Sequence, residues 1–113
     1  MTITDVTNVS QLEELFIQHE YVVVKFSAEW CGPCKRIHPL YERLSNTEKY
    51  NSVCFLHIDV DEVRDICDKY NVEGMPTFIL FHKGEEVERF AGANESKLNN
   101  MLDNCNIMYT TIR

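Results

Sequence analysis

The residues best suited to chemistry are two cysteines separated by two residues, within Trp30-Cys31-Gly32-Pro33-Cys34. The apolar run over residues 21–28 before this motif is typical of a buried strand, and an amphipathic helical pattern follows from Cys34. The N-terminus of a helix carries unpaired N–H groups and partial positive charge, which favour the thiolate of a cysteine placed there. Because the second cysteine can close on the first, the motif predicts two-electron exchange between a dithiol and a disulfide.

Size and composition limit the other possibilities. The chain has 113 residues, which fits one domain over residues 1–113. Its formal net charge is −7 and it has no basic stripe, so nucleic acid and anionic membranes are poor partners. No apolar stretch has the length of a membrane span, and the N-terminus lacks the pattern of a signal peptide. Five cysteines, an odd number, argue against a structural disulfide framework and for a reducing compartment, so we expect the cytoplasm. We also expect a monomer.

The elements that must position the two cysteines follow from hydrophobic spacing. Four segments repeat apolar residues at helical intervals, beginning at Leu12, Ile37, Val63 and Leu98. Apolar runs of strand length lie between them, over residues 3–6, 21–27, 53–59, 77–81 and 86–90. The order is β-α-β-α-β-α-β-β-α, in which strands joined through helices pair in parallel and the last two form a hairpin. We expect an α/β fold with a mixed sheet of about five strands and helices on both faces.

The ends of the helices are also predicted. Ser10 followed by Glu13 is typical of a capping box at the start of the first helix. Asp61 and Asn94 are suited to cap the third and fourth helices. Residues 104–113 are expected to fray at the C-terminus, and residues 106–113 are assigned as the C-terminal tail of the single domain over residues 1–113.

Three motifs together resemble the thioredoxin family. The segment from Trp30 to Lys35 has the family's residues, and so does Gly74-Met75-Pro76-Thr77-Phe78. Phe90, Gly92 and Ala93 match the family's segment after the last strand, and the similarity runs from about Val9 to Cys105. The resemblance implies the thioredoxin fold and protein-disulfide reductase activity that serves cell redox homeostasis.

The resemblance also assigns roles to individual residues. It implies that Cys31 is the exposed nucleophile and that Cys34, which is more buried, is the resolving thiol. Pro76 would be a cis-proline that exposes the backbone of Met75, so that a substrate strand can pair with it. An apolar contact surface around Cys31 is implied for Trp30, Gly32, Pro33, Gly74, Gly92 and Ala93. Of these, Gly32 and Pro33 would also modulate the pKa of the cysteines.

The cofactors and partners follow from the same resemblance. The chain has no nucleotide-binding motif and no metal-ligand pattern, so we expect no bound cofactor and no metal. The reducing equivalents would come from NADPH through a partner thioredoxin reductase. The substrates would be disulfide-containing proteins, with peroxiredoxins among the candidates.

One residue departs from the family's pattern. The family usually has an Asp beneath Cys34, where this chain has Lys25. A charged Lys25 would stabilise a thiolate and make the pair more oxidising, which is the interpretation we favour. Alternatively, desolvation could neutralise Lys25 and make it a base, or the side chain could reach solvent or pair with Asp59 and take no part in the chemistry.

Other functions and sites stay open at this stage. A thioredoxin-fold adaptor would use the groove for binding with little reductase turnover, and an oxidase or isomerase domain would share the fold. Cys54, Cys67 and Cys105 are expected to pack in the core, with Cys105 the most reachable of the three. His38 and His57 could handle protons, although ordinary hydrogen-bonded roles are the simpler interpretation.

Overall fold

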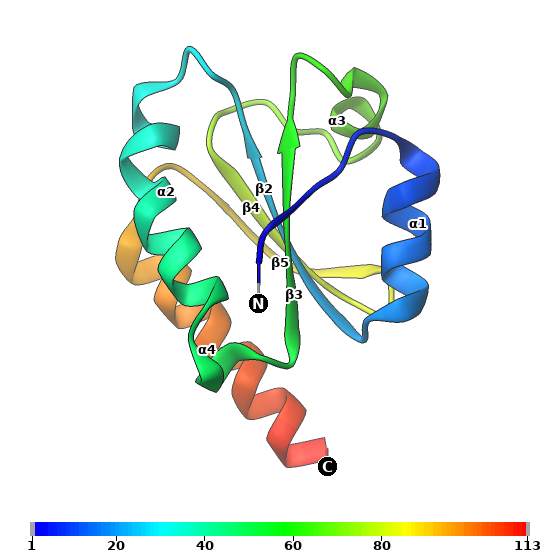
Figure 1. Cartoon of the computed structure of the whole chain (residues 1–113), viewed down its shortest axis with the longest axis vertical. Coiled ribbons are helices and arrows are strands. Elements are labelled where there is room, and N and C mark those ends of the chain that lie inside the picture. Colours follow the sequence, from blue (N-terminus) through cyan, green and yellow to red (C-terminus); the bar gives the residue numbers. More distant parts are fainter. Residues whose placement is uncertain (1, 113) are drawn as a thin grey trace.

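The computed structural model describes residues 2–112, which form five strands and four α-helices in the predicted order (Figure 1). The strands are β1 (Thr4–Asp5), β2 (Tyr21–Ser27), β3 (Val53–Asp59), β4 (Thr77–His82) and β5 (Glu85–Ala91). The helices are α1 (Val9–Gln18), α2 (Gly32–Ser45), α3 (Arg64–Lys69) and α4 (Glu95–Ile112), and a 3-10 turn, η1 (Glu48–Tyr50), precedes β3. Among these helices none is both long and apolar enough to cross a membrane.

The five strands form one mixed sheet in the order β1-β3-β2-β4-β5, which confirms the predicted fold class. β2 pairs in parallel with β3 and antiparallel with β4, and the β4–β5 hairpin closes the sheet. β1 lies at the other edge, parallel to β3. The apolar run of β2 is buried along its whole length because it lies at the centre of the sheet and is covered on both sides.

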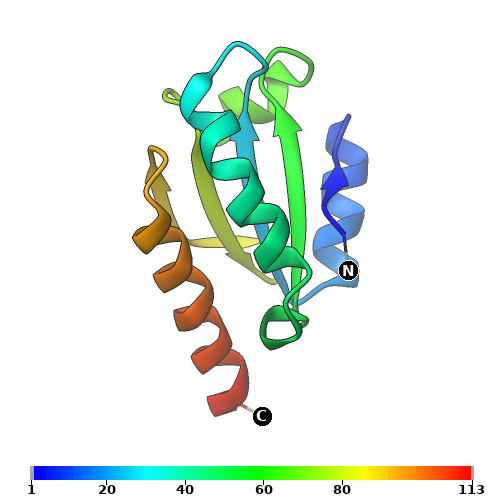
Figure 2. The same ribbon diagram turned by 60° about the vertical axis from the view of Figure 1, so that its left-hand side comes forward.

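Successive side chains of β2 point to opposite faces of the sheet and therefore contribute to two separate parts of the core. Tyr21 and Val23 belong to the core cluster that includes residues of α2 and α4, whereas Val22 and Val24 belong to the cluster that includes residues of α1 and α3. Figure 2 shows α2 and α4 on one side of the sheet and α1 on the other. Lys25 follows Val23 on the face toward α2 and α4 and therefore lies beneath α2. Lys25 thus follows the apolar residues Tyr21 and Val23 on this face and precedes the polar Ser27.

Two of the three predicted helix caps are wrong. The first helix begins two residues earlier than Ser10 suggests, because Asn8 is its N-cap and Asn8 Oδ1 accepts a hydrogen bond from the N–H of Gln11. The third helix begins at Arg64 and Asp61 does not cap it; Asp61 N–H instead donates to Asp59 Oδ1 in the preceding turn. Asn94 is confirmed as a cap, since its Oδ1 accepts from Lys97 N–H.

The predicted frayed tail is also wrong, because α4 continues to Ile112. Cys105 is fully buried against the α2 face of the sheet, and the ring of Tyr109 meets that of Tyr21 edge-on at 6.1 Å. These contacts give the last turns of the helix an apolar surface to pack on. Arg113, the last residue of the predicted tail, lies outside the described residues.

A buried hydroxyl joins α2 to the sheet and provides a test of this packing. Tyr41 Oη donates to Leu56 O at 2.7 Å and to Val23 O at 3.1 Å. Tyr41→Phe should lower the free energy of unfolding by about 1–3 kcal/mol, because this buried hydrogen bonding is lost while the ring volume is kept. Urea unfolding measures the change. Tyr70→Phe is the matched control, since the Tyr70 hydroxyl makes no hydrogen bond within the described residues, and equal losses for the two variants would contradict the prediction.

Candidate active site

The two motif cysteines lie where β2 gives way to α2, and they form a disulfide. Cys31 is the N-cap of α2, and its Sγ accepts a hydrogen bond from the N–H of Cys34 at 3.2 Å. Pro33 occupies the first turn, where a helix needs no backbone donor. The start of α2 therefore directs the N–H of Cys34 at the sulfur of Cys31, the position at which the sequence predicts a stabilised thiolate in the reduced protein.

The cysteine pair is covered by apolar side chains. Cys31, Cys34 and Ala28 form a small buried cluster, against which Met75 and Val60 pack. Cys34 is the more buried of the two, at 2% exposed, but Cys31 is only 5% exposed. The expectation of an exposed Cys31 is thus wrong for the disulfide form, because its sulfur is bonded to Cys34 and lies within this cluster.

The second family motif reaches the same cluster from the start of β4. The Met75–Pro76 peptide bond is cis, as expected. Met75 contacts the cysteine cluster, and Pro76 O accepts from the N–H of Gly92 at 2.8 Å. Gly92 has φ of +101°, a conformation that glycine adopts without steric cost. Pro76 and Gly92, far apart in the sequence, are therefore joined directly beside the disulfide.

The remaining residues of the implied contact surface lie at the outside. Trp30 is 71% exposed, and its indole N–H donates to Asp61 Oδ2 at 2.9 Å. This bond to the loop after β3 was not foreseen, because the two residues are distant in the sequence. Gly32, Pro33 and Gly74 are exposed, while Ala93 is half-buried against the α4 side of the core.

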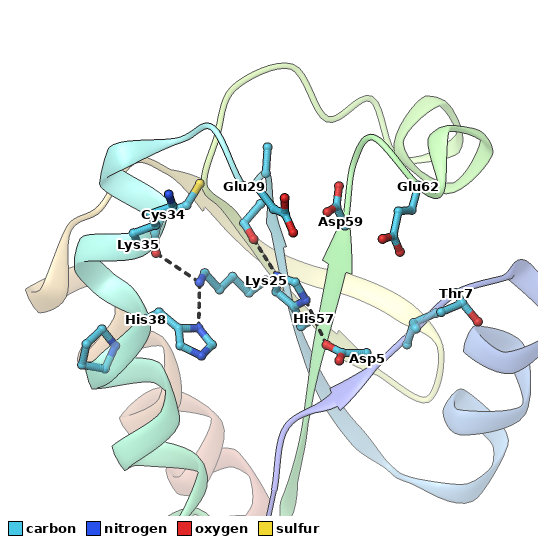
Figure 3. Close-up of a pocket in the computed structure, with 14 residues that line it drawn as sticks. Asp5, Thr7, Lys25, Glu29, Cys34, Lys35, His38, His57, Asp59 and Glu62 are labelled. Atoms are coloured by element: carbon cyan, nitrogen blue, oxygen red, sulfur yellow. Dashed lines mark hydrogen bonds and ion pairs between the residues drawn. The ribbon is translucent and has the colours of Figure 1, made fainter.

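Lys25 lies directly behind the disulfide and is 2% exposed. Its Nζ donates to Cys34 O at 3.2 Å and lies 3.0 Å from His38 Nδ1 (Figure 3). Burial lowers the pKa of Lys25 to about 8. The alternatives in which Lys25 reaches solvent or pairs with Asp59 are wrong: it is buried, and none of the ion pairs among the described residues involves it.

The two histidines are placed differently. His38 contacts Lys25, and burial, followed by the charge of Lys25, holds the pKa of His38 below its usual value. His57 is fixed by Ser27 Oγ, 2.7 Å from its Nε2, and by Asp5 Oδ1, 3.0 Å from its Nδ1. His57 thus has the hydrogen-bonded role that we expected, whereas His38 belongs to the surroundings of Cys34.

A cavity of about 550 Å³ opens beside these groups (Figure 3). Its floor includes Lys25, Cys34 and His38, and exposed side chains at its mouth include Glu29 and Glu62. The cavity therefore reaches Cys34 from a side of its own, since Trp30 is not among the residues that line it.

Comparison with known proteins identifies the arrangement. Residues 3–104 match the family model described as Thioredoxin. The chain belongs to the thioredoxin family. Thioredoxin 1 of Plasmodium falciparum is 43% identical over 98 residues, which are 87% of this chain and 92% of that protein.

Solved thioredoxin structures superpose closely on this one. A structure of Plasmodium falciparum thioredoxin has a TM-score of 0.86 at 40% identity, and the match covers 90% of this chain and 98% of that one. A chain from a study of thiol resolution in yeast mitochondrial 1-Cys peroxiredoxin via glutathione/thioredoxin systems has a TM-score of 0.84 at 35% identity, with 90% and 94% covered. Together with the cysteine pair, these similarities show a thioredoxin-type dithiol–disulfide oxidoreductase.

The other three cysteines of this thioredoxin are not placed for exchange. Burial raises the pKa of Cys54 to about 11 and, with smaller contributions from acidic neighbours, that of Cys105 to about 12. Cys67 is buried on the opposite face, and burial and nearby aspartates raise its pKa. The expectation that Cys105 is the most reachable is wrong, because it lies on the side of α4 that packs against the core and is fully buried, whereas Cys54 is half-buried. Across the described residues, no group of three or more His, Cys, Asp or Glu side chains is placed to hold a metal ion.

Proposed function

We propose that this protein reduces disulfides in other proteins through attack by Cys31 and resolution by Cys34. The Cys31 thiolate attacks a substrate disulfide and forms a mixed disulfide. Cys34 then attacks the sulfur of Cys31, which releases the reduced substrate and leaves the Cys31–Cys34 disulfide. The observation that carries this assignment is the position of Cys31 Sγ at the N-terminus of α2, where it already accepts a backbone N–H.

The substrate lies, in this proposal, across the surface made by Trp30, Met75 and Gly92. Trp30 supplies exposed apolar area, and the segment before Pro76 supplies backbone groups with which an extended substrate segment can pair. Gly32, Pro33, Gly74 and Ala93 complete this surface. Substrate recognition therefore depends on main-chain hydrogen bonds beside an apolar contact. Many disulfide-containing proteins can provide both.

The oxidised protein must be reduced again. An NADPH-dependent thioredoxin reductase is the partner that we propose, in the cytoplasm, with no cofactor bound to this chain itself. Peroxiredoxins are candidate substrates, a proposal supported by the similarity to the chain from the yeast peroxiredoxin study.

Coupled NADPH consumption tests turnover and partner together. The protein, a thioredoxin reductase and insulin should consume NADPH continuously, and omitting the protein should stop the reaction. With dithiothreitol in place of the reductase, the protein should still accelerate insulin reduction. If it accelerates neither reaction, the adaptor alternative replaces the reductase; if it accelerates only the second, the reductase is not its partner.

A further inference from the structure

The position of Lys25 creates an electrostatic imbalance in the oxidised protein. Its Nζ has two hydrogen-bond partners, the carbonyl of Cys34 and Nδ1 of His38, and both are neutral acceptors. A buried cation without a counter-ion is unfavourable, because neutral dipoles replace only part of its hydration. The oxidised protein therefore carries a positive charge that nothing within hydrogen-bond distance balances.

Other charges surround Lys25 at longer range. Titratable or charged groups on the elements packed around it are His57 and Asp59 of β3, Asp5 of β1, Cys34, Lys35, His38 and Glu42 of α2, and Glu29 and Glu62 of the adjoining loops. Asp5, Glu29 and Glu62 are exposed, so solvent screens them. Burial is the one cause that shifts the pKa of Lys25, to about 8, so the side chain is mostly protonated at neutral pH.

Reduction of the disulfide supplies the missing charge. We propose that the ammonium of Lys25, held in place by His38, is the counter-charge of the Cys34 thiolate and stabilises the reduced protein relative to the oxidised one. Lys25 is bonded to the backbone of the residue whose sulfur becomes negative, and both groups are almost fully buried, where charges interact strongly. This inference rests on the proposed resolving role of Cys34.

The resolving step conserves both electrons and protons. In the mixed disulfide, the Cys34 thiol gives its proton to solvent in the adjoining cavity, and Lys25 stabilises the thiolate that remains. The thiolate attacks Cys31 Sγ, the new S–S bond forms, and the bond between Cys31 and the substrate sulfur breaks. The electron pair leaves with the substrate sulfur, which takes a proton from solvent. Lys25 acts throughout as a positioning charge and transfers no proton.

Redox equilibrium with glutathione tests the proposal. Lys25→Met should make the disulfide about tenfold harder to reduce, which corresponds to a potential about 30 mV more negative. In a Cys31→Ser background, the same substitution should raise the pKa of the Cys34 thiol by about one unit, measured from thiolate absorbance during a pH titration. Both shifts have the same cause, the loss of the counter-charge.

Two further variants separate this role from general effects. Lys35→Met removes the same charge from an exposed side chain one residue beyond Cys34, and it should leave the potential within about threefold in the equilibrium constant. His38→Asn keeps an acceptor near the position of Nδ1, whereas His38→Leu removes it. The asparagine variant should retain the wild-type potential and the leucine variant should move toward that of Lys25→Met.

Three results would overturn the role proposed for Lys25. An unchanged potential in Lys25→Met, or an equal change in Lys35→Met, would overturn the proposal. Slower resolution of the mixed disulfide without a change in potential would also overturn it and would identify neutral Lys25 as a base. Insulin reduction by the wild-type protein is measured separately, so failure of the proposed function is distinguished from failure of this inference.

Discussion

Replacing Cys34 with serine should convert the protein from a catalyst into a trap for its substrates. Cys31 can still attack a substrate disulfide, but no second thiol lies beside it to resolve the product, because Cys34 is the only partner of Cys31 in the buried cluster. Turnover of insulin with NADPH and a reductase should fall at least about a thousandfold. Non-reducing gels and mass spectrometry should show the protein linked to its substrate.

Cys31→Ser should abolish both turnover and trapping, because the helix N-terminus then has no sulfur to activate. Cys54→Ser is the matched control: burial raises the pKa of the Cys54 thiol to about 11, so that it stays protonated, and turnover should be unchanged. A mixed disulfide formed by Cys31→Ser but not by Cys34→Ser would show that the roles of the two cysteines are reversed.

The strands and their order were predictable because their patterns are local and strong. The nearly continuous apolar runs over β2 and β3 are typical of central strands, and the two strands lie side by side inside the sheet. The break at Lys83 and Gly84 marks the hairpin, and both residues have the positive φ that such a turn requires. The WCGPC motif fixed the position of the disulfide for the same reason, since its spacing is set within one turn of helix.

Features that depend on distant partners were missed. The capping box expected at Ser10 and Glu13 is a separate and local error, because Asn8 caps the helix two residues earlier by accepting from the N–H of Gln11. Residues 104–112 are polar enough to suggest a tail, yet Cys105 and Tyr109 find an apolar surface that only the folded sheet provides. Tertiary packing thus decides what the local pattern leaves ambiguous.

The surroundings of Lys25 show the same limit within the site. Alignment with the family's motif placed Lys25 beneath Cys34, and the period of two along β2 places it on the face toward α2. The bond to His38 could not be read from the sequence, because it depends on how α2 crosses the sheet. Without that contact, the sequence favours a charged lysine that stabilises a thiolate but leaves open a neutral base, or a lysine that reaches solvent or pairs with Asp59.

The pH dependence of stability should show the burial of Lys25 directly. Its pKa falls from an ordinary 10.5 to about 8 on folding. Below pH 8 the side chain is charged in both states, and its burial destabilises the folded protein. Between pH 8 and 10.5 the unfolded chain binds more protons than the folded one, so stability rises with pH, and above 10.5 the penalty is gone.

Lys25→Met removes this dependence. In the oxidised state, the free energy of unfolding of Lys25→Met should exceed that of the wild type at pH 7. This excess should decrease by about 2–3 kcal/mol between pH 7 and pH 10, measured by urea unfolding at each pH. Using the difference between the two proteins cancels the titration of groups that Lys25 does not influence, which leaves out His38, whose pKa the charge of Lys25 lowers. Lys35→Met should run parallel to the wild type. In the reduced protein the decrease should be smaller, because the Cys34 thiolate already balances Lys25. Parallel curves for Lys25→Met and the wild type in the oxidised state would mean that the buried lysine carries no charge that the fold must accommodate.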